Sequence, residues 1–205
     1  MWILQRNRDT LLATTLLACA VYGQESNLPP EEPGVFKTQA NATIDAPIDV
    51  VWNALLDFPS YPDWNPFVRS QVLASDLFIP LDDQSNPVAG QKLIINVQTP
   101  PLDPPVDADT PSDPLHAQMS YENITVLEGA PTYRCAWKQI MIVDALLNAT
   151  RWQALSTLED GRTYYEAREV YSGSLATTLE STLGEGLQQG FDVQASELKA
   201  YVEGA

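Results

Sequence analysis

The residues most able to do chemistry in this sequence are a cation and a carboxylate on two segments joined by one turn. Arg151 lies in segment 149–158 and Glu169 in segment 163–171, and both segments alternate in polarity as strands do. The residues between them, Glu159-Asp160-Gly161-Arg162, include the Asp-Gly pair typical of a β-hairpin. A hairpin would place Arg151 beside Glu169, either as a buried pair that balances its own charge or as groups that orient the polar end of a ligand.

Each strand of this hairpin offers one further polar candidate. Gln153 has the parity of Arg151 and of Leu155, which we expect to face inward, and Tyr165 has the parity of Glu169. If the site is catalytic, the candidates for proton transfer are Glu169, Tyr165 and Arg151. A purely structural role for the same side chains stays open.

Most other chemistries lack their residues. The single histidine, His116, and the two cysteines, Cys19 and Cys135, leave no ligand set for structural zinc or for a two-histidine iron site. The sequence contains no glycine-rich phosphate loop and no nucleophile elbow. We expect no metal and no cofactor, His116 at the surface, and Cys135 as a small buried apolar side chain.

Residues 1–23 have the layout of a secretory signal peptide. Arg6 and Arg8 precede an apolar run of about 12 residues from Leu11 to Tyr22, and small residues stand where cleavage would occur. A membrane span needs roughly 20 residues, so we expect no stable membrane anchor. This pattern predicts a secreted protein; a disordered N-terminus in an intracellular protein, or a lipoprotein modified at Cys19, stays open. Sequons for N-glycosylation at Asn41, Asn123 and Asn148 agree with secretion.

The composition describes one acidic globular domain. With 205 residues, of which 44% are hydrophobic, the chain can bury one substantial core. The 27 acidic residues against 11 Lys and Arg give a net charge of −16, which repels anionic membrane surfaces and excludes nucleic acid as a partner. We expect an acidic, proline-rich linker at 24–34 and one domain at 35–203. Residues 100–114, with six prolines and four aspartates, should form an exposed loop insertion.

Seven segments of the domain are predicted as strands. Alternation or short apolar runs bounded by turn residues mark them at 35–47, 68–78, 91–99, 115–128, 132–139, 149–158 and 163–171. Asn41 falls on the polar side of the first strand. In the fourth strand the apolar parity changes, which predicts a bulge near Glu122 or Asn123.

Helices are predicted on either side of these strands. Asp49 can cap a short helix with apolar residues at helical spacing, and Pro59 and Pro62 separate it from a second short helix. After Ser174, taken as the cap, an apolar stripe predicts a final helix of roughly 25 residues. It contains three glycines, which indicate either a close neighbour or a bend around the sheet: Gly184, Gly186 and Gly190.

Two stretches resemble signatures of the START-like SRPBCC superfamily, in particular its polyketide cyclase/dehydrase and lipid-transport branch. They are ATIDAPIDVVWNALLDFPSYPDWNPF near the start of the domain, and DGRTYYEAREVYSG followed by an apolar helix ending in QQGFDVQ near its end. The resemblance implies an α+β helix-grip fold: a curved seven-stranded antiparallel sheet wraps around the long C-terminal helix, with two short helices after the first strand. It also implies a cavity between sheet and helix. Arg151 stands near a place where that branch often has a histidine.

On this fold we expect the cavity wall to combine aromatic, aliphatic and polar side chains. Trp64 either contacts a ligand or packs in the core, and the apolar segment 140–148 either covers the cavity entrance or continues the strands. The residues expected to bind a ligand are Trp64, Phe67, Trp137, Arg151, Gln153, Tyr165, Glu169, Leu187 and Phe191.

Three functions fit these observations. The first is binding or transport of a hydrophobic small molecule, such as a lipid, sterol, quinone or polyketide. The second is a cofactor-independent cyclase or dehydratase of secondary metabolism, and the third is a ligand-free protein-interaction module. We place binding first, because acid–base residues are few and a secretory signal suits a carrier.

Overall fold

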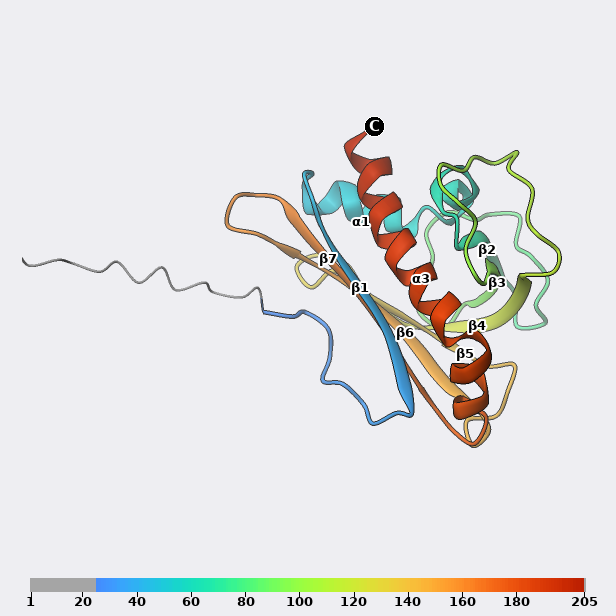
Figure 1. Ribbon diagram of the computed structural model, residues 1–205. Helices are drawn as coiled ribbons and strands as arrows, with labels where there is room; N and C mark the ends of the chain where they lie inside the picture. Colours follow the sequence, from blue (N-terminus) through green and yellow to red (C-terminus); the bar gives the residue numbers. More distant parts are fainter. Residues whose placement is uncertain (1–24, 205) are drawn as a thin grey trace, which may run out of the picture.

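One strand, short helices, six further strands and a long helix follow one another in the domain, as the sequence predicts, in the computed structural model that describes residues 25–204 (Figure 1). The predicted signal peptide and Cys19 lie outside the described residues. The strands are β1 (Phe36–Ile44), β2 (Val68–Ala74), β3 (Lys92–Gln98), β4 (Ala117–Glu128), β5 (Arg134–Gln139), β6 (Asn148–Thr157) and β7 (Thr163–Ser172). The helices are α1 (Ile48–Leu56), the 3₁₀ turn η1 (Phe58–Ser60), α2 (Tyr61–Trp64) and α3 (Ala176–Glu203).

The seven strands form one antiparallel sheet in the order β1-β7-β6-β5-β4-β3-β2. The predicted hairpin joins β6 to β7, and Gly161 takes the left-handed conformation that its turn requires, with φ of +85°. In β7 the residues with one parity are buried on the inner face, which confirms the predicted alternation: Thr163, Tyr165, Ala167 and Tyr171.

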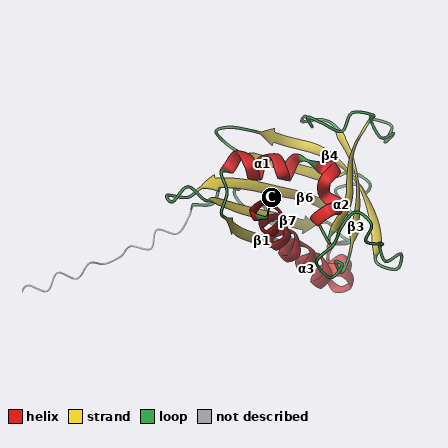
Figure 2. Cartoon of the chain, turned by 90° about the horizontal axis from the view of Figure 1, so that it is seen from above, coloured by secondary structure: helices red, strands yellow, loops and turns green. Residues whose placement is uncertain are grey.

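The sheet bends strongly, and the helices lie on its concave side. Figure 2 shows β1, β7 and β6 forming one wall and β3 part of another, with α1, α2 and α3 inside the bend. The helix-grip architecture expected from the sequence is therefore confirmed. Trp52 on α1 is buried, and its ring meets that of Tyr133, just before β5, edge-on with centroids 5.7 Å apart.

Close approach explains two of the glycines in α3. A Cβ added at Gly190 would lie 2.4 Å from the ring of Phe67, and one at Gly186 would lie 2.9 Å from a methyl carbon of Thr99. At Gly184 an added Cβ would make only ordinary contacts, 3.6 Å or longer. Of the two explanations that the sequence left open, contact with a neighbour therefore applies to Gly186 and Gly190.

Both predicted helix caps were wrong. Pro47 occupies the N-cap position of α1, so Asp49 lies in the first turn, where its charge favours the helix dipole and its carboxylate accepts a hydrogen bond from the Tyr133 hydroxyl. Leu175, not Ser174, is the N-cap of α3. Backbone contacts with the β5–β6 loop hold this junction instead, because the Ser174 amide donates to the Ala145 carbonyl over 3.1 Å.

The bulge in β4 lies slightly beyond its predicted position. Pairing with β5 shifts between Ile124 and Val126, so the extra residue is Thr125 rather than Glu122 or Asn123. This shift places Glu122 on the same inward face as Ile124. Asn123 faces the convex side, where its side-chain oxygen accepts a hydrogen bond from Lys92 over 3.0 Å.

The two irregular segments both attach to the sheet. In the stretch predicted as a linker, the backbone N–H of Asn27 donates to the Glu166 carboxylate over 2.6 Å. The Asn27 side-chain amide donates to the backbone carbonyls of Thr132 and Leu155. The 100–114 loop forms no strand, as predicted, but Arg69 of β2 ties it down by donating to the carbonyls of Asp107 and Thr110. The loop is therefore held against β2 by hydrogen bonds to its backbone.

Candidate functional site

A cavity of about 270 Å³ lies between α3 and the concave face of the sheet. Its apolar wall comes from β2, β3, β5, the β5–β6 loop and α3, and includes Phe67, Ile95, Val97, Trp137, Met141, Leu147, Leu179, Leu183 and Leu187. Its polar groups are fewer: Gln71, Gln118, Ser120, Glu122, Gln139, Arg151, Glu169 and Gln194. The site is therefore an apolar chamber with polar groups contributed from several strands and from α3.

Arg151 is the one basic side chain among the described residues that line this cavity. Its register places it opposite Glu169 on β7, as predicted, and opposite Trp137 on β5. The guanidinium turns toward α3, where Nη2 donates to the Gln194 side-chain oxygen over 2.9 Å and the charge lies 4.1 Å from the centre of the Phe191 ring. Arg151 is only 6% exposed, so this cation is held within the core.

Two carboxyl groups share the cavity with Arg151. Burial, reinforced by the negative charge of Glu169, raises the pKa of Glu122 to about 8, and the Ser120 hydroxyl donates to Glu122 over 2.9 Å. Burial also raises the pKa of Glu169, while the charge of Arg151 acts in the opposite direction. At neutral pH the Glu122 carboxyl is therefore largely protonated.

A hydrogen-bonded group of buried polar side chains supports Arg151. The Tyr165 hydroxyl donates to the Gln153 side-chain oxygen over 2.6 Å, and the Gln194 amide nitrogen lies 3.3 Å from the same oxygen. Burial raises the pKa of Tyr165 to about 12, so its hydroxyl stays protonated at neutral pH. These side chains orient Gln194, which in turn holds Arg151.

The predicted site residues fall into three groups. Five of them line the cavity: Phe67, Trp137, Arg151, Glu169 and Leu187. Three are buried next to Arg151 without lining it: Gln153, Tyr165 and Phe191. Trp64 lies outside the cavity, where it stacks on Tyr201 with ring centroids 5.7 Å apart.

Sequence reasoning missed Glu122, Gln71 and Gln194. Glu122 was missed because the parity of β4 depends on where its bulge lies. Gln194 could have been found from helical spacing, since it lies three residues beyond Phe191 and so shares its face of α3. Gln71 was missed because β2 is short, and the pattern of its few residues does not show which side chains face inward.

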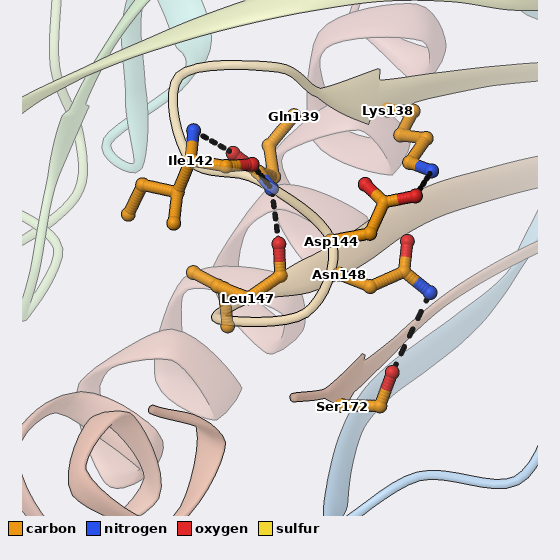
Figure 3. A network of polar contacts seen from close by, with 7 residues as sticks. All are labelled: Lys138, Gln139, Ile142, Asp144, Leu147, Asn148 and Ser172. Carbon is orange, nitrogen blue, oxygen red and sulfur yellow. Dashed lines mark hydrogen bonds and ion pairs between the residues drawn. The ribbon is translucent and has the colours of Figure 1, made fainter. Parts of the chain in front are cut away.

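The β5–β6 loop contributes Met141, Ile142 and Leu147 to the cavity wall. It does not continue the strands, since β5 ends at Gln139 and β6 begins at Asn148. Figure 3 shows how Gln139 holds the loop: its amide nitrogen donates to the Ile142 and Leu147 carbonyls, and its oxygen accepts from the Ile142 amide over 3.1 Å. An ion pair between Lys138 and Asp144, 2.6 Å long, braces the outer side.

The remaining predicted positions lie away from the cavity. Asn41 is exposed on β1, and the Asn148 amide lies 3.4 Å from the Ser172 hydroxyl. His116 is at the surface beside Asp113, and Cys135 is fully buried, as the sequence predicted.

No helix of residues 25–204 is long and apolar enough to cross a membrane. In the same range, no group of three or more His, Cys, Asp or Glu side chains is arranged to hold a metal ion.

Comparison with known proteins yields one partial family match. Residues 44–91, which run from the end of β1 to the start of β3, match the family model described as polyketide cyclase / dehydrase and lipid transport. Among curated proteins, none matches the sequence.

Solved structures resemble nearly the whole domain. A hypothetical protein of Helicobacter pylori has a TM-score of 0.59 at 12% identity, with 82% of this chain and 88% of that chain covered. The major latex-like protein 151 of Panax ginseng has 0.55 at 10% identity, covering 81% and 96%. A START superfamily protein of Mycobacterium smegmatis has 0.52 at 13% identity, covering 82% and 97%. At such low identity the likeness shows the fold alone, and that fold is START-like.

Proposed function

We propose that this protein binds and carries a compact hydrophobic molecule in the cavity beneath α3. The observation that carries the proposal is the cavity itself, a space of about 270 Å³ lined mainly by aromatic and aliphatic side chains. This volume is near the lower end of the roughly 300–1,000 Å³ typical of ligand pockets. A cavity of this size suits a single compact ligand. The partial family match and the START-like neighbours support the same reading.

The alternative of a ligand-free interaction module is less well supported. Such a module has no need of a hollow core, because filling the cavity with larger side chains would add stability. In this protein Gly190 leaves room for the Phe67 ring, which itself forms part of the cavity wall.

A cyclase or dehydratase is the second candidate, and one observation favours it. Glu122 and Glu169 face one cavity in different electrostatic surroundings, since Glu169 lies opposite Arg151 and Glu122 accepts a hydrogen bond from a serine. Pairs of carboxyls with separated pKa values are a common arrangement for an acid and a base. In such an enzyme Glu122 would supply a proton and Glu169 would accept one.

Glu169→Gln separates the two candidates. If Glu169 only orients a ligand, the variant keeps its shape and one acceptor oxygen, so affinity should fall about tenfold or less. If Glu169 is a general base, affinity should persist while turnover falls by roughly 10² to 10⁴. Glu185→Gln, on the exposed face of α3, is the matched control.

The ligand is best sought by native mass spectrometry of the purified protein, followed by solvent extraction. A co-purifying apolar molecule supports the carrier. If no molecule co-purifies, binding of the neutral dye N-phenyl-1-naphthylamine, measured by the fluorescence of the dye, serves as the assay. A protein that retains nothing and does not bind the dye would contradict the proposal.

We also propose that the mature protein is secreted and glycosylated at Asn41. The apolar run at Leu11–Tyr22 and the exposed position of Asn41 on β1 support this proposal. N-terminal sequencing of the secreted protein should find a start between Val21 and Glu25, and Asn41→Gln should remove one glycan mass. Recovery of a chain that begins at Met1 would contradict it.

A further inference from the structure

The wall of the cavity holds two carboxyl groups and one cation. Among the described residues that line it, the acidic and basic side chains are Glu122 on β4, Glu169 on β7 and Arg151 on β6. In the same part of the chain, the lining side chains from β2, β3, β5, the β5–β6 loop and α3 are apolar or uncharged polar groups. Tyr171 on β7 also lines the cavity, but burial raises the pKa of its hydroxyl well above 10, so it stays neutral up to pH 9.

Arg151 is able to balance only one of these carboxylates. Its register places it directly opposite Glu169, and its charge favours the ionised form of that group. Glu122 instead lies between Leu93 on β3 and Gln139 on β5, neither of which carries a charge. With both carboxyl groups ionised, the apolar cavity would carry a net negative charge, which is costly where solvation is poor. A single proton on the two carboxyl groups makes the cavity neutral.

A hydrophobic ligand makes this proton more important. The Glu122 and Glu169 side chains are both half-buried and line the cavity, so water that enters the cavity is able to solvate an ionised carboxylate. A ligand that fills the cavity excludes this water and raises the free energy of a carboxylate without a counterion, while the neutral acid loses much less. Ligand and proton therefore favour each other's binding, and by linkage they do so by the same factor.

We propose that pH regulates this carrier: the Glu122–Glu169 pair takes up a proton when an apolar ligand binds, and the ligand is released when alkaline pH removes that proton. The inference rests on the proposed function, because it describes the regulation of the same cavity. On release, the proton leaves a carboxyl oxygen of the pair and passes to water, while Arg151 keeps its charge.

Fluorescence titration with N-phenyl-1-naphthylamine, which is uncharged over this range, measures the affinity at pH 7, 8 and 9. Burial and the charge of Glu169 raise the pKa of Glu122 to about 8. At pH 9 about one molecule in ten therefore keeps the proton, and the apparent affinity falls with the fraction that is able to bind. We expect the dissociation constant of the wild-type protein to be about tenfold higher at pH 9 than at pH 7.

Calorimetry at pH 8 measures the proton directly and at a single pH. The dye is titrated into the wild-type protein in two buffers of different ionisation enthalpy, and the difference in heat gives the number of protons taken up. With a pKa of about 8, half of the protein carries the proton before binding, so we expect uptake of about half a proton per dye molecule. This measurement needs no variant.

Two variants assign the effect to the carboxyl pair. Glu122→Gln keeps the shape of the side chain but has no proton to lose, so its dissociation constants at pH 7 and pH 9 should be nearly equal. Glu169→Gln removes the negative charge that raises the pKa of Glu122, so the midpoint of the pH dependence should move to lower pH. Glu185→Gln, exposed on α3, is the control and should keep the tenfold change.

The possible results separate the inference from the proposed carrier. Dye binding with equal affinity at pH 7 and pH 9, or without proton uptake at pH 8, overturns the inference and leaves the carrier intact. A tenfold change that persists in Glu122→Gln, or an unshifted midpoint in Glu169→Gln, overturns the role of the pair. Absence of dye binding at every pH overturns both the inference and the proposed function.

Discussion

Glu122→Gln should stabilise the folded protein near neutral pH, by an amount that grows as the pH rises. Burial and the charge of Glu169 raise the pKa of Glu122 from 4.5 to about 8 in the folded state. The folded protein therefore holds a proton that the unfolded chain releases. The stability associated with this proton is complete below pH 4.5 and is lost as the pH rises to about 8. Glutamine has no proton to lose and still offers an oxygen to the Ser120 hydroxyl.

The magnitude follows from the separation of the two pKa values. Between pH 5.5 and 7.5 the unfolded carboxyl is ionised and the folded one is mostly protonated, so stability changes by up to 1.36 kcal/mol per pH unit, or about 2.7 kcal/mol in all. Glu122 is only partly buried and shares its proton equilibrium with Glu169. We therefore expect a relative gain of about 1–2 kcal/mol for the variant over this range.

Urea unfolding of both proteins at half-unit pH steps from 5.5 to 7.5 measures this difference directly. Glu203→Gln is the control, because its hydrogen bond with Lys199 lowers the pKa of Glu203 and keeps its titration below this range. The difference between wild type and the control should stay constant. A constant difference for Glu122→Gln as well, or a gain that shrinks as the pH rises, would refute the argument for a protonated carboxyl.

Two further predictions concern α3 and the cavity entrance. Gly190→Ala should destabilise the protein by about 1–3 kcal/mol and weaken dye binding, because the new methyl group must displace the ring of Phe67, 2.4 Å away. Gly184→Ala should instead stabilise it by up to about 1 kcal/mol, and similar effects in both variants by urea unfolding would count against the close-contact explanation. Gln139→Leu removes the side-chain hydrogen bonds that hold loop 140–147, so hydrogen exchange of the loop amides should accelerate about tenfold or more while the strands keep their protection. Exchange at the wild-type rate would mean that other contacts hold the loop.

Local pattern was enough to predict the individual elements, because each has its own signal, whereas the helix-grip arrangement was implied by the family resemblance. Alternation in 163–171 identified both the strand and its inward face, and the Asp160-Gly161 turn fixed its partner. The leucine stripe identified α3. Helix starts were less predictable, since Asp49 and Ser174 are common cap residues but backbone and loop contacts at these two junctions replace a side-chain cap.

The candidate site was less predictable because it depends on irregular backbone. In β4, apolar residues occur at both parities, so the sequence indicates a bulge without locating it. A bulge at Glu122 or Asn123, as predicted, left the orientation of Glu122 undecided. At Thr125 it places Glu122 beside Glu169 in the cavity. A shift of two residues thus decides whether the site has one carboxyl group or two.

Arg151 shows why strand register alone does not determine an interaction. The sequence places it opposite Glu169, and the structure has that register, yet the guanidinium donates to Gln194 and lies against Phe191. These two residues are three positions apart on α3, so they present an oxygen and a ring from one helix face. The orientation of the guanidinium is therefore set by α3, a neighbour in space that the pairing of β6 with β7 does not reveal.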